Sequence, residues 1–201
     1  MNFLVYLCPV FYFCISWFFP WQLIQWDSSI SITYLFDLAF VCVFYFILEP
    51  KMKLKVEIGI FIRLLITIAL ALICITITSS FNLSAPFKYV DNLFIQILVL
   101  APIIEELVFR FAFYEMFKEK ISNRKIQFVL NSLLFSISHS AALAVLPTEF
   151  YPFIFFQIIY TFFLGWICTK AKDLSQSIIE PIILHFVFNL FFYFAVIKGV
   201  I

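Results

Sequence analysis

The amino-acid sequence predicts an all-α fold: a polytopic integral membrane protein with about seven transmembrane helices. Hydrophobic residues make up 65% of the 201 residues and charged residues only 12%, and the mean hydropathy is +1.09. These values lie far outside the usual composition of soluble domains, so lipid is the expected solvent. The apolar residues recur in runs of about 17 to 25, the length that crosses roughly 30 Å of hydrocarbon. Short polar connections leave no room for a soluble domain, which predicts a single transmembrane domain over residues 1–201.

Each predicted helix is an apolar run bounded by polar residues. The first run lacks the basic start and the small-residue cleavage site of a signal peptide, so we expect it to remain as a helix. The fourth follows Asp91, a candidate capping residue, and the seventh opens on a capping-box pattern formed by Ser177 and Glu180. Residues 1–90 match no family-specific pattern, whereas residues 91–198 carry the candidate catalytic groups. In chain order the predicted spans are Phe3–Ile24, Ser31–Leu48, Ile58–Thr78, Asn92–Phe117, Ile126–Leu146, Pro152–Thr169 and Ile178–Lys198.

The positions of lysine and arginine predict the orientation in the membrane. They gather in alternate connections, at 49–57, 118–125 and 169–177, whereas the intervening connections hold only Lys88. Because cytoplasmic loops are enriched in these residues, we expect those three connections and the amino terminus to be cytoplasmic. The near balance of 13 basic and 12 acidic residues gives no reason to expect a nucleic-acid partner.

Three ionisable residues, Glu105, Glu106 and Arg110, lie far from both ends of the fourth predicted helix. Each charge at mid-membrane costs about 2.5–3.5 kcal/mol, and three of them cost of order 8–10 kcal/mol unless they are compensated, so such residues indicate a functional site. Glu106 and Arg110 are i,i+4 neighbours and are expected to form an ion pair. Glu105 has no such cation, which makes it the candidate for proton transfer. Pro102 is expected to kink the helix and open space beside Glu105.

Both histidines of the chain also fall in predicted membrane helices. His139 lies in the fifth helix, and His185 lies in the seventh, four residues before Asn189. At 1.5 Å per residue, these three residues lie about 20, 10 and 16 Å from the cytoplasmic ends of their helices. Together with Glu105 they can meet in one cavity, which we expect in the cytoplasmic half of the membrane. For either histidine alone, a hydrogen bond between helices remains the alternative.

The order of these residues resembles the three motifs of the CAAX-protease and bacteriocin-processing (CPBP) family, formerly called Abi. The family motifs E-E-x-x-x-R, F-x-x-x-H and H-x-x-x-N correspond to Glu105–Arg110, Phe135–His139 and His185–Asn189. The resemblance extends from Pro102 to Asn189. One departure is Phe111, where many members have glycine.

The resemblance implies an intramembrane peptidase with a buried active-site cavity. In such an enzyme Glu105 and His139 activate a water molecule, while His185 and Asn189 stabilise the oxyanion. Glu106 and Arg110 then hold and tune the site, and the substrate is a peptide or protein in the bilayer.

A metal-free site is the expectation, and zinc is the alternative. The sequence contains no H-E-x-x-H zinc motif, no G-x-S-x-G elbow and no second membrane aspartate to pair with Asp37. Two histidines and a glutamate can nevertheless hold zinc. Asn189 favours the metal-free site because an amide is a poor zinc ligand and a good oxyanion donor.

Two other functions remain open on the sequence. The first is a bacteriocin self-immunity protein that sequesters a peptide or its receptor without cleaving it. The second is a proton-coupled transporter, which the absence of an internal two-half repeat disfavours. The Phe- and Ile-rich, lysine-using composition indicates a bacterial source and a multi-pass protein of the cell membrane, whereas the substrate cannot be identified from the sequence.

Overall fold

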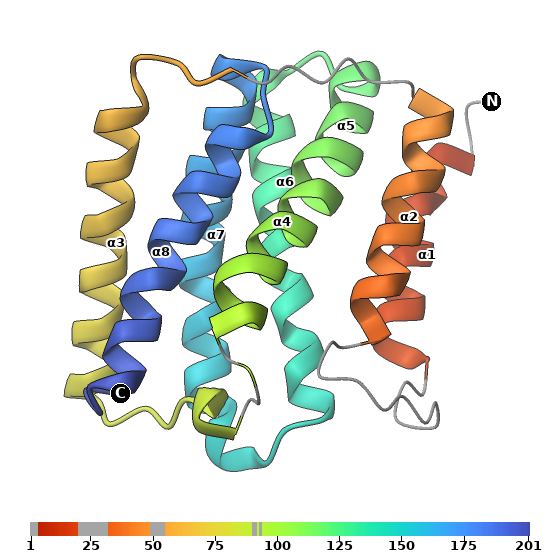
Figure 1. Cartoon of the computed structure of the whole chain (residues 1–201). Coiled ribbons are helices and arrows are strands. Elements are labelled where there is room, and N and C mark those ends of the chain that lie inside the picture. The colour runs from red at the N-terminus through yellow and green to blue at the C-terminus, as the bar shows by residue number, and fades with distance from the viewer. Residues whose placement is uncertain (1–3, 20–31, 49–54, 90–91, 93) are drawn as a thin grey trace.

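The protein is an all-helical bundle (Figure 1). The computed structural model describes residues 4–19, 32–48, 55–89, 92 and 94–201, and no strand occurs in this part of the chain. Asp91, predicted to cap a helix, lies outside the described residues. The long helices are α1 (Leu4–Phe18), α2 (Ile32–Leu48), α3 (Ile60–Ser80), α7 (Tyr151–Ser175) and α8 (Ile179–Ile197), and α6 (Arg124–Ser138) continues into the 3₁₀ turn η5 (His139–Ala144).

The remaining long helix is continuous but not uniformly α-helical. Two π-helical segments, η3 (Phe94–Leu100) and η4 (Leu107–Phe113), flank α4 (Ala101–Glu106), and α5 (Tyr114–Lys120) completes it. Figure 1 shows these pieces as one green helix between α8 and the α1/α2 pair. Counting this helix once, the described residues form about seven helices, which confirms the predicted fold class.

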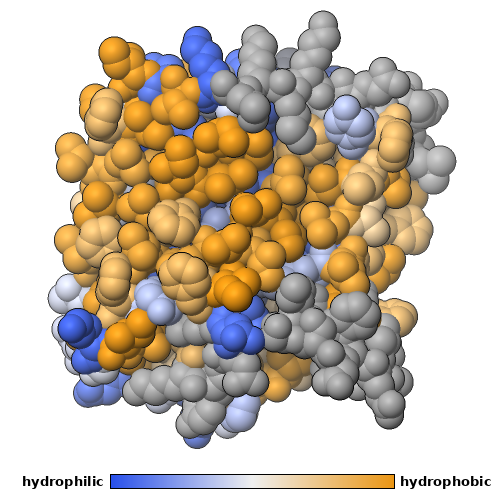
Figure 2. All heavy atoms as spheres, in the orientation of Figure 1, coloured by the Kyte–Doolittle hydropathy of each residue, from blue (hydrophilic) through white to orange (hydrophobic). Residues whose placement is uncertain are grey.

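The helices present an apolar belt of the kind that a bilayer requires. Four of them, at Ile60–Ser80, Arg124–Ala144, Thr148–Ser175 and Ile179–Ile197, are long and apolar enough to cross a membrane, and shorter apolar helices occur at Leu7–Phe18 and Ile32–Phe46. In Figure 2 hydrophobic residues cover the middle of the visible face, and hydrophilic residues gather towards its two ends. Many large apolar side chains on this belt are exposed, as lipid contact requires.

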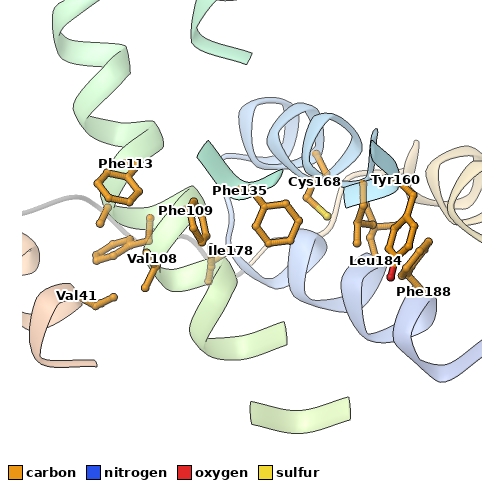
Figure 3. Close-up of a cluster of buried hydrophobic side chains, with 14 of the residues drawn as sticks. Val41, Val108, Phe109, Phe113, Phe135, Tyr160, Cys168, Ile178, Leu184 and Phe188 are labelled. Atoms are coloured by element: carbon orange, nitrogen blue, oxygen red, sulfur yellow. The ribbon is translucent and has the colours of Figure 1, made fainter. Parts of the chain in front are cut away.

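Aromatic packing joins the α1/α2 pair to the rest of the bundle. The Tyr12 ring of α1 lies 4.8 Å from the Phe40 ring of α2 and 5.4 Å from the Phe113 ring of η4. Figure 3 shows the buried cluster continuing from Val41 of α2 through Phe109 and Phe135 to Phe188 of α8. Since lipid supplies no hydrophobic force between helices, close packing of this kind holds them together.

The start of α8 differs from the predicted capping box. Ser177 Oγ accepts a hydrogen bond from the Ile179 amide at 3.2 Å, as a cap would. Glu180, however, is fully buried and pairs with Arg63 of α3, and its Oε2 accepts from the Glu57 amide at 3.2 Å. Arg63 also bonds Glu57, and this bond holds the pKa of the Glu57 carboxyl below its usual range. Glu180 thus links α8 to α3 instead of capping its own helix, and Arg63 is buried with it.

The orientation predicted from the basic residues is open to a direct labelling test. Ser122 lies in the connection between α5 and α6, and Thr148 lies at the opposite end of the bundle; both are exposed. Ser122 is preferable to Asn123, whose side chain caps α6. We expect a membrane-impermeant thiol reagent applied to intact cells to label Thr148→Cys above the parent background and to leave Ser122→Cys unlabelled. The reverse pattern would invert the topology.

Candidate active site

The backbone of the long central helix sets the position of the two adjacent glutamates. Glu105 and Glu106 end α4, directly after a π-helical segment and Pro102. Proline has no amide hydrogen, so the i→i−5 bond of a π-helix that would reach the Ile97 carbonyl cannot form at this position. Instead, the Asn189 side-chain amide of α8 donates to Ile97 O at 2.9 Å. Asn189 therefore satisfies a carbonyl at the irregular part of the helix and ties α8 to the segment that carries the glutamates.

Glu106 and Arg110 form the predicted ion pair. Arg110 Nε lies 3.1 Å from Glu106 Oε2, and both side chains have no exposed surface. The two atoms are close enough for an ion pair but are not aligned for a hydrogen bond, and Arg110 Nη1 has no hydrogen-bond partner. The guanidinium also lies 4.2 Å from the centre of the Phe135 ring, a favourable cation–π position.

A glycine makes room for this arginine between α6 and α7. Arg110 Nη2 donates to the Gly165 carbonyl at 3.3 Å. A Cβ atom at Gly165 would lie 3.1 Å from both the Phe135 ring and Ser132 Cα, and 3.4 Å from Arg110 Nη2. Any larger residue would therefore press on the helix contact and on the guanidinium together.

His185 lies between the two glutamates. Its Nδ1 lies 2.8 Å from Glu106 Oε1, and its Nε2 lies 3.9 Å from Glu105 Oε2. Because a carboxylate accepts the hydrogen bond, the Nδ1–H of His185 donates to Glu106. The sequence predicts only the contact of Glu106 with Arg110, since nothing in a single sequence pairs two residues that are 79 positions apart.

His139 is oriented by its own helix. It is the first residue of η5, where α6 tightens into a 3₁₀ turn, and its Nδ1 lies 2.9 Å from the Phe135 carbonyl. A carbonyl can only accept, so Nδ1 carries the hydrogen, and in the neutral ring Nε2 is left as the basic atom. The Phe135 ring packs edge-on against both His139 and His185. Phe135, which carries little information in a chain with 30 phenylalanines, is therefore central to the site.

Four of the six predicted residues line one cavity. Glu105, His139, His185 and Asn189 face a hollow of ≈ 200 Å³, whereas Glu106 and Arg110 lie behind it. Glu105 is the more accessible glutamate, with 27% of its side chain exposed, and its Oε2 has no hydrogen-bond partner. The structure thus brings all six residues together and separates a cavity-facing carboxylate from a buried, paired one. Among the described residues, no three His, Cys, Asp or Glu side chains are grouped as metal ligands.

Several polar residues near the site bond to backbone carbonyls. Asn131 shares a helical face with His139, but its side-chain amide donates to the Phe109 carbonyl at 2.6 Å, and its oxygen accepts from Thr169 at 2.9 Å. Ser136 bonds the Ile158 carbonyl on α7, whereas Ser138 and Ser140 bond back to their own helix.

Comparison with known proteins assigns the part of the chain that holds the site to a protein family. No curated protein and no solved structure matches the chain. A family model described as type II CAAX prenyl endopeptidase Rce1-like matches residues 92–191, about half of the chain. This stretch contains all six site residues and confirms the resemblance read from the three motifs. Through residues 92–191, the chain belongs to the Rce1-like family of type II CAAX prenyl endopeptidases, a family of intramembrane peptidases.

Proposed function

We propose that this protein is a glutamate-dependent intramembrane endopeptidase that hydrolyses a peptide bond of a membrane-associated or prenylated protein, or of a peptide precursor. The observation that carries the proposal is that two basic groups line one cavity: the Glu105 carboxylate, whose Oε2 accepts no hydrogen bond, and His139, whose Nδ1 is held by the Phe135 carbonyl so that Nε2 is the basic atom. We place the protein in a cell membrane. Its composition supports a bacterial source, and its basic loops support an active site in the cytoplasmic half of the membrane.

A water molecule bound between Glu105 and His139 is the nucleophile in this proposal. Glu105 takes one of its protons as the water oxygen attacks the scissile carbonyl carbon, and His139 holds the water by accepting its second hydrogen at Nε2. The tetrahedral intermediate then collapses, and Glu105 delivers its proton to the nitrogen of the leaving amine. Glu105 thus serves first as the base and then as the acid.

The oxyanion faces the opposite wall of the cavity. One hydrogen of the Asn189 amide is used by Ile97 O, and an amide carries a second hydrogen that can be donated to the oxyanion. His185 donates from Nδ1 to Glu106, so its Nε2 can donate to the oxyanion only when the ring is doubly protonated. The counter-charge that this cation requires is supplied by Glu106 at 2.8 Å, with Glu105 at 3.9 Å.

Glu106 and Arg110 position the other groups. They are fully buried, and Glu106 contacts His185 while Arg110 packs on Phe135, the ring that also contacts both histidines. Neither side chain lines the cavity, so we assign them to orientation and charge balance.

The test of this function is a comparison of membrane peptides and protein termini from cells with and without the protein. We expect new termini that appear only when the wild-type protein is present. A phenotype of peptide immunity without any new terminus would instead support the non-catalytic, sequestering alternative. The matched family is described as one of endopeptidases, which favours cleavage over sequestration.

A metal-independent reaction is a further expectation. The amide of Asn189 and the hydrogen bonds of His139 and His185 suit proton transfer and oxyanion binding. Turnover by the purified protein should therefore survive exhaustive treatment with a zinc-selective chelator. Loss of turnover that stoichiometric zinc restores would make His139, His185 and a glutamate metal ligands.

A further inference from the structure

Glu105 and His139, the two residues proposed to activate water, lie at the junction of two hollows. The hollow already described extends towards α7 and α8, and a second hollow of ≈ 210 Å³ extends between α1, α2 and the central helix. Three residues, Tyr34, Glu105 and His139, line both. A peptide whose scissile bond lies at Glu105 and His139 therefore places the residues on one side of that bond in one hollow and those on the other side in the second.

The two hollows differ in chemistry beyond the residues that they share. Towards α7 and α8 the lining combines aromatic and aliphatic side chains such as Leu164 and Phe188 with the uncharged amides of Gln157 and Asn189. Among the described residues that line it, Glu105 is the one carboxylate. The hollow beside α1 and α2 carries a carboxylate, Asp37, in the second turn of α2. These α1 and α2 residues lie outside the stretch that the family model matches.

Asp37 is a carboxylate without a cation. Its Oδ1 accepts a hydrogen bond from the hydroxyl of Tyr12 at 2.8 Å, which fixes the side chain towards α1. Within the described ranges, no lysine, arginine or histidine forms an ion pair with it, whereas Glu57, Glu106, Glu115, Asp173 and Glu180 all have one. The ionised form of a carboxyl group that faces an intramembrane cavity is costly unless a cation supplies the compensating charge, so a cation that enters the hollow is stabilised beside Asp37.

We propose that the hollow between α1 and α2 is a subsite for a basic side chain of the substrate and that Asp37 is its specificity-determining residue. Lysine or arginine next to the scissile bond pairs with Asp37, with Tyr12 holding the carboxylate in position. The opposite hollow accepts an aromatic or aliphatic side chain. This inference rests on the proposed peptidase function and adds the class of substrate: a membrane-embedded peptide with a basic residue on one side of the cleaved bond.

The test uses the full chain in proteoliposomes and a synthetic peptide library with apolar flanks. Each peptide carries lysine, its uncharged analogue norleucine, or glutamate at one of three positions on either side of the central bond. We expect wild-type kcat/KM to be at least about 10-fold higher for lysine than for norleucine at one position only, the size expected when a desolvated charge pair is lost. Asp37→Asn should bring this ratio close to one, and Asp37→Lys should make glutamate the preferred residue.

Inversion of the preference by Asp37→Lys is a result that a merely structural role of Asp37 would not produce. The matched control is Glu119→Gln, the loss of an exposed carboxylate far from both hollows, which should leave the ratio unchanged. Cleavage of the library with equal rates for lysine and norleucine in wild type and Asp37→Asn would overturn the subsite and leave the peptidase function standing. If no peptide in the library is cleaved, the proposed function itself fails, and the subsite fails with it.

Discussion

Replacing Glu105 with glutamine should reduce peptide cleavage by about 10²–10⁴-fold, the usual contribution of a general base, without weakening the fold. The substitution keeps the volume of the side chain and removes its proton acceptor. The cationic partner of Glu105 in the described part of the chain is His185 at 3.9 Å, which keeps Glu106 at 2.8 Å after the substitution, so no buried cation is left unpaired. The measurement is thermal stability in detergent beside the rate of cleavage for the same preparation.

The matched control for Glu105→Gln is the same change at Glu119, an exposed residue of α5 in the same long helix. Glu119→Gln should keep both the stability and the activity of the parent. A Glu105→Gln protein that is well folded and fully active would rule out Glu105 as the base, and the sequestering function would then explain the site better.

Replacing Arg110 with alanine should destabilise the fold as well as abolish activity. Removal of one partner of a fully buried ion pair typically costs about 3–5 kcal/mol because the other charge is left uncompensated. Here Glu106 would keep only His185 at 2.8 Å, and the Gly165 carbonyl and the Phe135 ring would each lose their contact with the guanidinium. The free energy of unfolding can be measured by titration with denaturing detergent from mixed micelles.

Arg124 provides the contrast for Arg110. It pairs with Asp173, and 58% of the Arg124 side chain but only 11% of the Asp173 side chain is exposed. Asp173 keeps the hydrogen bond from the Tyr114 hydroxyl at 2.7 Å when Arg124 is removed, and ion pairs with a solvated partner contribute about 0–1 kcal/mol. Arg124→Ala should therefore be nearly neutral.

A double-mutant cycle that combines Arg110→Ala with Glu106→Gln tests the buried pair itself. The loss of unfolding free energy in the double variant should be smaller than the sum of the losses in the two single variants. An Arg110→Ala protein as stable as the parent would mean that the buried pair does not hold the site together.

The parts of the site that follow from local geometry could be predicted from the sequence. The pairing of Glu106 with Arg110 is set by the four-residue spacing in one helix, and the apolar runs set the number and order of the helices. The depth of each polar residue within its helix placed Glu105, His139, His185 and Asn189 near one another, and the structure brings them to one cavity. In each case the information lies within one segment of the chain.

The contacts between helices could not be predicted in the same way. Ser177 and Glu180 have the spacing of a capping box, yet Glu180 pairs with the arginine of a distant helix and accepts a hydrogen bond from the Glu57 amide. Asn131 shares a helical face with His139, but its side chain bonds the Phe109 carbonyl and Thr169 of other helices. The π-helical segments on either side of α4 determine which backbone carbonyls lack a hydrogen bond within the helix. Pro102 is the local feature of the sequence that indicates this irregularity.

The most direct measurement of the central claim is a cleavage reaction run in water enriched in ¹⁸O. If Glu105 activates a water molecule that attacks the peptide carbonyl, each new carboxyl terminus should carry one ¹⁸O atom after a single turnover, and Glu105 itself should remain unlabelled. Glu105→Gln should form such labelled termini about 10²–10⁴-fold more slowly. New termini without ¹⁸O, together with label in the Glu105 side chain, would show that Glu105 attacks the peptide directly and would contradict the proposed mechanism.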